Sequence, residues 1–486
     1  MSKKESVVVA KFGGSAIGNE GDFIPIVVNR IKQMSKKNKI ITVFSAPIIS
    51  YDGKSRSMTD VAIDVGRKYA ASKPIDIEIL RRIYDIIAKK YVSEQYIQEF
   101  NEILDKFYSL VKTSLNNARD NKRFTDVTRS RILAYSGEIT MSYLMDYIMK
   151  SNGIKSDHVR VENWPIITDD NFEGANFMLS ESRQKREHLL DLINKNDVIS
   201  IGGFIGKTMD GLETTYERGG SDRTAADIAI ILHDLYDTEV DLEKDNVVLS
   251  ADPKIVKDNL DYVKYLSYNE ATLAGMFGMK ILDPVAIKEI DDNNLDIPIV
   301  ITSISDPSKV TIIRKSFDES VGDDDNLLIK IVTGKRNCAI VRMESIAALY
   351  LVGSLEKEKQ YYNFIKLSPY KNENIEITRI LFLDADYVKK NEHKIKAYYP
   401  KTEFVYGRGV VTLIGDKMWK VSKIASTASS TVGEYDINIL DLDAQEETSR
   451  ILIIVNDSGD NVANAVKAIH SQRGHIHNNS NVDKNK

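Results

Sequence analysis

Two short runs of β-branched residues near the N-terminus enclose a glycine pair and an amphipathic stretch. Val7 to Phe12 ends at Gly13-Gly14, apolar residues between Phe23 and Met34 recur at helical spacing, and Ile40 to Ala46 forms the second run. A strand, a tight loop, a helix and a second strand in this order place the strands in parallel, with the helix on one face of the sheet. This unit predicts an α/β fold for the N-terminal part of the chain.

The same pattern returns further along the chain. Three more strand-like runs occupy Asp197 to Phe204, Asn246 to Ser250 and Asp296 to Thr302. We therefore expect residues 1–317 to form one α/β domain around a mostly parallel sheet. Residues 74–122 have apolar residues at helical spacing and no strand-like run, which indicates a helical insertion in this domain.

The acidic and polar stretch from Asp318 to Asn326 favours a solvated connection, and we place the main domain boundary there. Beyond it, residues 327–400 and 401–473 each alternate strand-like and helix-like runs. Each half is the size of a small ferredoxin-like α+β module. Residues 474–486 are almost free of apolar side chains, so they predict a polar, solvated tail.

Length and composition limit the possible partners and compartments. With 486 residues the chain is long enough for two or three domains, and its net charge of -5 does not predict binding to nucleic acid or to a membrane. Its apolar runs are too short for a membrane span or a signal peptide, which predicts a cytoplasmic protein. The single cysteine, Cys338, lies in an apolar run and predicts a buried structural thiol rather than a nucleophile.

The glycine pair belongs to the sequence KFGGS, residues 11–15, between a predicted strand and a predicted helix. In this setting glycines let backbone N–H groups approach an anion, and the helix dipole favours negative charge. A simple tight turn is the alternative interpretation of an isolated glycine pair. Lys11, at the start of this loop, favours phosphate binding.

A second cluster, Arg218-Gly219-Gly220-Ser221-Asp222, opens an apolar helix-like run. Ser221 or Asp222 would cap that helix under any interpretation. Capping alone does not require the arginine and the two glycines, whereas a small anionic substrate needs a guanidinium fork beside helix N-terminal donors. Upstream, the glycines of IGGFIGKTMDG allow close approach of the backbone to a ligand, or else form a flexible connecting loop.

These motifs, with five others in the same order, resemble those of the aspartate kinases of the amino acid kinase family. The others are YSGE (135–138), TDDNF (168–172), SADP (250–253), LSYNEA (266–271) and GMKILDP (278–284). The resemblance spans residues 7 to about 305 and implies a three-layer αβα sandwich. The C-terminal modules resemble tandem ACT regulatory domains, which implies a possible amino-acid effector and a homodimer built through these domains.

The resemblance also implies a reaction and its residues. Mg²⁺-bound ATP would transfer its γ-phosphoryl group to the β-carboxylate of L-aspartate, the first step of lysine, threonine and methionine biosynthesis. Lys11, Asp222 and Lys280 would be catalytic, with Asp222 organising the lysines. Glu138 would bind the substrate ammonium and Arg218 its α-carboxylate, with Ser45 and Ser221 nearby. The nucleotide would contact Lys11, Gly13, Gly14, Ser15, Gly219, Gly220, Lys244, Leu249, Lys254 and Lys280. No protein metal site is predicted.

The chain departs from the family pattern around SADP. Glu243-Lys244, Leu249 and Lys254 stand where the family has Thr-Asp, Tyr and Arg, which leaves the base preference open. The first ACT-like module lacks the glycine-rich turn of an effector pocket, so feedback control and its effector stay open. A related kinase acting on glutamate and a catalytically impaired amino acid sensor are the alternatives to an aspartate kinase.

Overall fold

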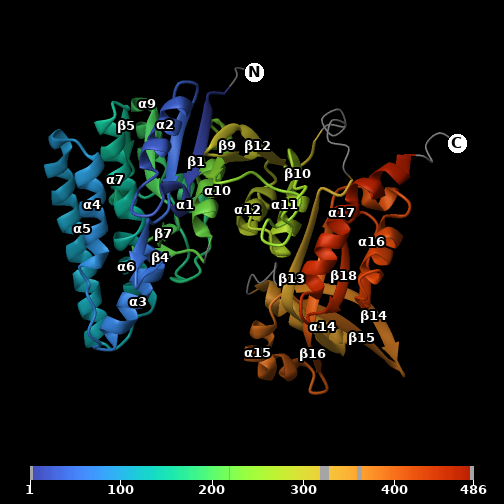
Figure 1. The fold of residues 1–486 in the computed structure, drawn as a ribbon. Helices are drawn as coiled ribbons and strands as arrows, with labels where there is room; N and C mark the ends of the chain where they lie inside the picture. The colour runs from blue at the N-terminus through green and yellow to red at the C-terminus, as the bar shows by residue number, and fades with distance from the viewer. Residues whose placement is uncertain (1–3, 218, 318–327, 358–363, 482–486) are drawn as a thin grey trace. The chain divides into compact units, whose positions relative to one another are not determined.

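The computed structural model describes residues 4–217, 219–317, 328–357 and 364–481 (Figure 1). The chain divides into two compact units, each with its own internal contacts. Unit 1 comprises Met1–Val247 and Val285–Arg314, and unit 2 comprises Val248–Pro284 and Lys315–Lys486. The segment 248–284, which we expected within the N-terminal domain, therefore groups with the C-terminal part. The expected linker at 318–326 lies outside the described residues.

A mostly parallel sheet forms the centre of unit 1, in the order β12-β11-β9-β1-β2-β6-β5. Adjacent strands are parallel except for β11 and β12, which are antiparallel. These strands are β1 Ser6–Phe12, β2 Lys39–Phe44, β5 Ser156–His158, β6 Val198–Gly202, β9 Asp237–Lys244, β11 Ile299–Ser303 and β12 Asp306–Arg314. The prediction of an α/β fold with a mostly parallel sheet is confirmed.

The strand that we expected at Asn246 to Ser250 is wrong, because the structure places the strand earlier, as β9. β9 reads DTEVDLEK, and its acidic residues conceal its buried character in the sequence. Asp241 and Glu243 are buried there beside Arg30, whose Nε donates to Glu243 Oε1 at 2.6 Å. Arg30 compensates the negative charge of these two buried acids, which would otherwise be costly to bury.

Some helices of unit 1 pack on this sheet, and α4 and α5 form the predicted insertion. They are α1 Gly14–Ile17, α2 Ile24–Met34, α3 Met58–Ala70, α4 Ile79–Tyr91, α5 Glu94–Asp120, α6 Asp126–Ser136, α7 Glu138–Ser151, α8 Leu179–Gln184, α9 Glu187–Lys195, α10 Gly220–Leu232 and α12 Pro284–Asp292, with a 3-10 turn at Val161–Asn163. α4 and α5 run side by side within the segment that we predicted as a helical insertion (Figure 1). α10 contacts β1, β2 and β9, and α7 contacts β2, β5 and β6. Two hairpins complete the unit: β3 Ile48–Tyr51 with β4 Lys54–Ser57, and β7 Ile205–Lys207 with β8 Glu213–Thr215.

Unit 2 is built around an antiparallel sheet in the order β14-β15-β13-β16-β18-β17. Its strands are β13 Ile331–Glu344, β14 Phe364–Asn372, β15 Ile375–Phe382, β16 Glu403–Ile414, β17 Ile439–Asp443 and β18 Arg450–Asn456. Its helices are α14 Ser345–Lys357, α15 Ala385–Tyr398, α16 Ile424–Gly433 and α17 Asn461–Asn481, with a 3-10 turn at Met418–Lys420. The segment 248–284 adds the short strand β10 Tyr265–Ser267 and the helix α11 Tyr268–Met276.

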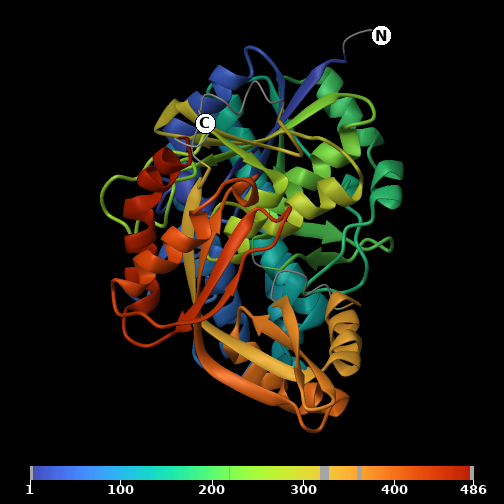
Figure 2. The same ribbon diagram turned by 90° about the vertical axis from the view of Figure 1, so that its right-hand side faces the viewer.

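The two α+β modules of unit 2 are nested rather than consecutive. One hydrophobic core contains Ala339 and Met343 of β13, and Phe404 of β16 packs against it. The other core contains Val332 of β13, Val411 of β16 and Ile469 of α17. The long strands β13 and β16 each contribute one half to either core, and Figure 2 shows the orange and red segments at opposite ends of this unit. The ranges 327–400 and 401–473 therefore do not match its two cores. A one-dimensional pattern cannot show that a strand is shared.

The C-terminal segment also differs from the expectation of a solvated tail beginning at residue 474. α17 continues to Asn481, so residues 474–481 are helical, and residues 482–486 lie outside the described part. Cys338 is fully buried, as predicted. Within the described residues, no helix is both long and apolar enough to cross a membrane.

Candidate active site

The carboxyl ends of four parallel strands bring the predicted site residues of unit 1 to one edge of the sheet. Lys11 is near the end of β1, Ser45 follows β2, Gly202 ends β6 and Lys244 ends β9. Two backbone hydrogen bonds hold the loops together, from Ser45 N to Phe12 O at 3.1 Å and from Gly203 N to Phe44 O at 2.9 Å. Ligands of open α/β sheets bind at this edge, because the loops there are free to vary.

Asp222 joins two lysines at this edge. Its carboxylate lies 2.8 Å from Lys11 Nζ and 3.4 Å from Lys244 Nζ, and it is only 7% exposed. Burial opposes the ionisation of Asp222, but the two ammonium groups outweigh that effect and lower its pKa to about 2. Asp222 is therefore a permanent anion that fixes two cations in place. Asp222 was predicted to organise the catalytic lysines Lys11 and Lys280; the structure pairs it with Lys11 and Lys244, and its role in catalysis stays a prediction.

The glycines around these lysines leave no room for side chains. A Cβ at Gly13 would lie 3.3 Å from Lys11 Nζ, and one at Gly14 would lie 3.2 Å from the Ala46 carbonyl oxygen. A Cβ at Gly203 would lie 2.7 Å from the Ser221 side chain. Gly219, the residue before α10, has a φ of 95°, a conformation that glycine adopts without strain. Backbone N–H groups can therefore approach an anion closely at this edge.

Glu138 is the first residue of α7 and is 4% exposed. Gly137 separates α7 from α6, because it leaves the helical conformation with φ −124° and ψ −111°. Glu138 Oε1 accepts a hydrogen bond from Thr59 Oγ1 at 3.5 Å, whereas its buried Oε2 has no hydrogen-bond partner in the described structure. Burial raises the pKa of Glu138 to about 7, although nearby backbone N–H groups, Thr59 and the charge of Lys11 oppose the shift.

A buried carboxylate with an unpaired oxygen is costly unless a cation or a proton satisfies it. Ala46 lies between Glu138 and the loop after Lys11: a Cβ at Gly137, the residue before Glu138, would lie 3.5 Å from Ala46 Cβ, and the Ala46 carbonyl oxygen faces Gly14. Glu138 therefore lies at the same edge of the sheet as the lysine pair. Nearby, the Ser45 and Ser221 hydroxyls lie 3.0 Å apart and connect the loop after β2 to the start of α10. This arrangement combines a cationic end, Lys11 and Lys244, with an anionic receptor for a small cation, Glu138.

The structure does not bring all predicted site residues into one described group. Lys11, Gly13, Gly14, Ser15, Ser45, Glu138, Gly219, Gly220, Ser221, Asp222 and Lys244 belong to unit 1. Leu249, Lys254 and Lys280 belong to unit 2, and Arg218 lies outside the described residues. The roles of all these residues, in either unit, stay predictions. Sequence reasoning missed Thr59 as a partner of Glu138. It noted Glu243 only as a departure from the family pattern and did not recognise Asp241 and Glu243 as buried acids of a strand.

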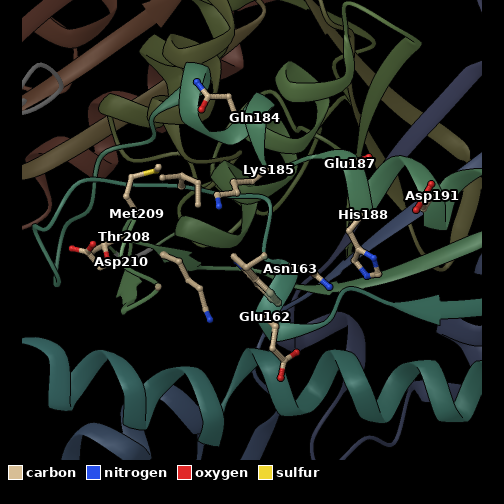
Figure 3. A pocket seen from close by; sticks show the side chains of 14 residues that line it. Glu162, Asn163, Gln184, Lys185, Glu187, His188, Asp191, Thr208, Met209 and Asp210 are labelled. Atoms are coloured by element: carbon tan, nitrogen blue, oxygen red, sulfur yellow. The ribbon is translucent and has the colours of Figure 1, made fainter.

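A second hollow in unit 1 is separate from the residues predicted for catalysis. This pocket has a volume of about 560 Å³ and lies beside the turn after β7, with Lys185, His188 and Asp210 among its lining residues (Figure 3). Both signs of charge line it. Lys207, also in its lining, lies 3.8 Å from Glu213 in the structure. The pocket therefore offers no single charge preference that would define a ligand.

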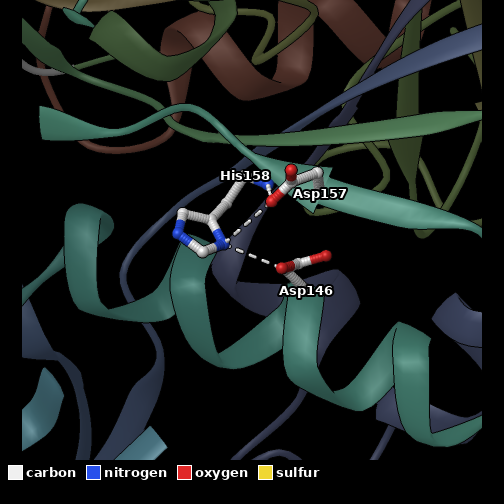
Figure 4. Close-up of side chains that lie close together, drawn as sticks. All are labelled: Asp146, Asp157 and His158. Atoms are coloured by element: carbon white, nitrogen blue, oxygen red, sulfur yellow. Dashed lines mark hydrogen bonds and ion pairs between the residues drawn. The ribbon is translucent and has the colours of Figure 1, made fainter. Parts of the chain in front are cut away.

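Asp146, Asp157 and His158 lie close enough together to suggest a metal site (Figure 4). Asp146 Oδ2 is 2.8 Å from both His158 Nδ1 and Lys150 Nζ, and Ser156 Oγ donates to Oδ1 at 2.6 Å. Burial opposes the ionisation of Asp146, but His158 and Lys150 outweigh it and lower the pKa. Because an ammonium group already neutralises this carboxylate, we interpret the group as a structural ion pair that anchors α7 to β5.

The amino acid kinase family profile matches residues 6–303, and the chain belongs to this family. Among curated proteins it is similar to the bifunctional aspartokinase/homoserine dehydrogenase of Buchnera aphidicola, with 23% identity over 95% of this chain and 56% of that protein. It is also similar to the chloroplastic aspartokinase 2 of Arabidopsis thaliana, with 24% identity over 96% of this chain and 84% of that protein. The chain thus spans about half the length of the bifunctional relative.

Solved structures show the same fold along almost the whole chain. Escherichia coli aspartokinase III in complex with aspartate and ADP has a TM-score of 0.74 at 18% identity. The aspartate kinase of Clostridium acetobutylicum has a TM-score of 0.64 at 21% identity. Each comparison covers 96% of this chain and 99% of the other. The predicted sandwich followed by ferredoxin-like α+β modules is therefore confirmed as a fold.

Proposed function

We propose that this chain is an aspartate kinase, which transfers the γ-phosphoryl group of ATP to the β-carboxylate of L-aspartate to give 4-phospho-L-aspartate. The observation that carries the proposal is Glu138, a buried carboxylate with an unpaired oxygen, in the same site as the Lys11–Asp222 pair. An amino-acid substrate brings an ammonium group to satisfy such a carboxylate. The similarity to aspartokinases along nearly the whole chain supports aspartate as that amino acid.

The nucleotide would bind where the backbone and the lysines converge. Because Gly13 and Gly14 carry no side chains, phosphate oxygens could approach the N–H groups of the loop after β1, next to Lys11 Nζ. Lys11 and Lys244 would neutralise negative charge on these oxygens, and Asp222 would hold both ammonium groups in position. ATP would enter with Mg²⁺ bound to its phosphates, so the metal arrives as part of the substrate.

The chemical step asks mainly for alignment and for fixed positive charge. An ionised β-carboxylate attacks the γ-phosphorus, the bond from the γ-phosphorus to the bridging oxygen breaks, and ADP leaves. No general base is needed, because the nucleophile carries no proton at neutral pH. Positive groups that are already in place stabilise the charge of the transition state without reorganisation. Lys11 and Lys244, held by Asp222, have this property, and the family resemblance implies the same role for Lys280.

Steady-state phosphoryl transfer tests the proposal. The intact chain should turn over L-aspartate, and glutamate and N-acetylglutamate should be poorer acceptors; ATP, GTP and CTP compared side by side would show the base preference. Lys11→Met should lower kcat by roughly a hundredfold or more, the usual effect of removing one charge-stabilising group. Lys32→Met, at an exposed position on α2, is the matched control. Absence of turnover with aspartate and every nucleotide would refute the proposal.

A further inference from the structure

A pocket of about 440 Å³ lies entirely within unit 2. Its lining comes from the segment 260–265, which follows the SADP motif, and from Ser250, Lys330 and Arg473. Several contacts fix this framework: Val332 N donates to Ser250 O at 2.9 Å, and Ser250 Oγ is 2.9 Å from His470 Nε2. A strand of the sheet and the helix α17 therefore hold the SADP segment from two sides. The pocket is a built feature of this unit.

Arg473, on α17, is the most unusual residue of the lining. It is only 5% exposed, and its guanidinium pairs through Nη2 with the carboxylate of Asp261. Its other terminal nitrogen, Nη1, is buried and has no hydrogen-bond partner among the described residues. Burial lowers the pKa of Arg473, in keeping with its small exposed surface. A buried donor on a cation without an acceptor is costly, and an anion in the pocket would satisfy it.

The charges around the pocket also favour an anion. Three cationic side chains, Lys264, Lys330 and Arg473, line it, against a single carboxylate, Asp261. Asp261 has a 63% exposed side chain and is largely solvated, so it opposes an anion weakly. Lys330 Nζ donates to Glu270 at 2.8 Å. An ammonium group has three donors, so this bond leaves capacity for a second acceptor.

The remaining wall is aromatic and apolar. The side chain of Tyr262 is 43% exposed, and Val263 is buried beside it. Tyr265 also lines the pocket, and Phe317 packs edge-on against its ring with 5.3 Å between the centroids. Partly exposed tyrosine rings next to cations suit a ligand that carries an apolar or planar body beside its charge.

We propose that this pocket binds a small organic anion, whose phosphate or carboxylate group pairs with Arg473 and whose apolar or planar body lies against Tyr262. The pocket lining includes none of the residues that we assign to phosphoryl transfer and none that we assign to nucleotide contacts, so we infer a ligand other than the two proposed substrates. Because Ser250 belongs to the pocket, a bound ligand would contact the motif that the family resemblance assigns to nucleotide binding.

Binding of ring-bearing probes to the full chain tests this site. Phenyl phosphate, benzoate, benzylamine and inorganic phosphate would be titrated calorimetrically, with aspartate and ADP present at saturating concentrations so that the catalytic site is filled. We expect phenyl phosphate or benzoate to bind, benzylamine not to bind and inorganic phosphate to bind more weakly. Whichever of phenyl phosphate and benzoate has the higher affinity identifies the preferred anionic group. A higher affinity for either of them than for inorganic phosphate supports the site.

Two variants and two controls connect binding to the pocket. Arg473→Gln should weaken binding of the preferred ring anion about tenfold or more, because a charge-assisted hydrogen bond is lost. Tyr262→Ala changes an exposed side chain, should leave folding intact and should weaken the ring anion severalfold while leaving inorganic phosphate unchanged. Arg336→Gln and Tyr435→Ala, exposed positions of unit 2 outside the pocket, should change neither affinity.

Three results would overturn the proposal: no saturable binding of either ring anion, equal binding of benzylamine, or unchanged affinity in both pocket variants. If Arg473→Gln does not fold, Tyr262→Ala decides alone. Kinase turnover is measured separately, so a failure of this site and a failure of the proposed function give different results.

Discussion

Glu138 should make the affinity for aspartate depend on pH. Burial raises the pKa of Glu138 to about 7. At pH 6 the carboxyl group is then ~90% protonated, and at pH 8 only ~10%. A protonated carboxyl group cannot pair with an ammonium group as an anion does, so aspartate should bind about tenfold more weakly at pH 6 than at pH 8. Binding should release close to one proton at pH 6 and almost none at pH 8.

Isothermal titration of aspartate in buffers of different ionisation enthalpy measures both the affinity and the protons released. Nucleotide is omitted, because its phosphate titrates in the same range. Glu138→Gln should weaken binding at pH 8 and remove the proton release. Glu239→Gln is the matched control, because burial also raises the pKa of Glu239 to about 7 and no role in binding is assigned to it. The control should retain the pH dependence of the native chain, including any part that comes from the ligand.

The raised pKa of Glu138 also predicts that the folded state becomes less stable as the pH rises, whereas the affinity for aspartate increases. A carboxyl group whose folded pKa exceeds its unfolded value of 4.5 loses stability as the pH rises toward 7. The difference of about 2.5 pKa units corresponds to roughly 3 kcal/mol above pH 7. Glu138→Gln should therefore raise the stability of unit 1 to denaturant at pH 8 and have little effect at pH 4. An affinity that is independent of pH, together with unchanged stability of the variant, would contradict this account of Glu138.

Two further predictions concern buried groups outside the predicted site. Arg30→Met leaves Asp241 and Glu243 buried without their cation, which should cost roughly 3 kcal/mol at pH 8, measured by denaturant unfolding. This cost should shrink toward pH 5, because burial raises the pKa of both Asp241 and Glu243, so both acids become neutral as the pH falls; an equal cost at both pH values would contradict this reasoning. Burial also raises the pKa of Cys338 to about 12, so a thiol reagent at pH 8 should label it only after unfolding, and rapid labelling of the native chain would show that the thiol is accessible.

The sequence by itself determined the local features of the fold and the order of the motifs. The β-branched runs at β1 and β2, the helical spacing of α2 and the glycines after β1 are local signals, because strand and helix periods are visible within a few residues. Cys338 could likewise be predicted as buried from its apolar neighbours. The candidate site residues of unit 1 were found through motif order, since a glycine pair alone does not distinguish a phosphate loop from a turn.

Tertiary structure decided the features that depend on partners distant in the sequence. β9 was missed because its acids signal exposure, and only the fold brings Arg30 to neutralise them. The two modules of unit 2 share β13 and β16, a division that depends on which halves of the strands pair in space. The sequence identified Glu138 as a substrate residue by resemblance, but its raised pKa exists only because folding buries one carboxylate oxygen without a partner. Periodicity is a local property of the chain, whereas charge compensation and burial are properties of the folded molecule.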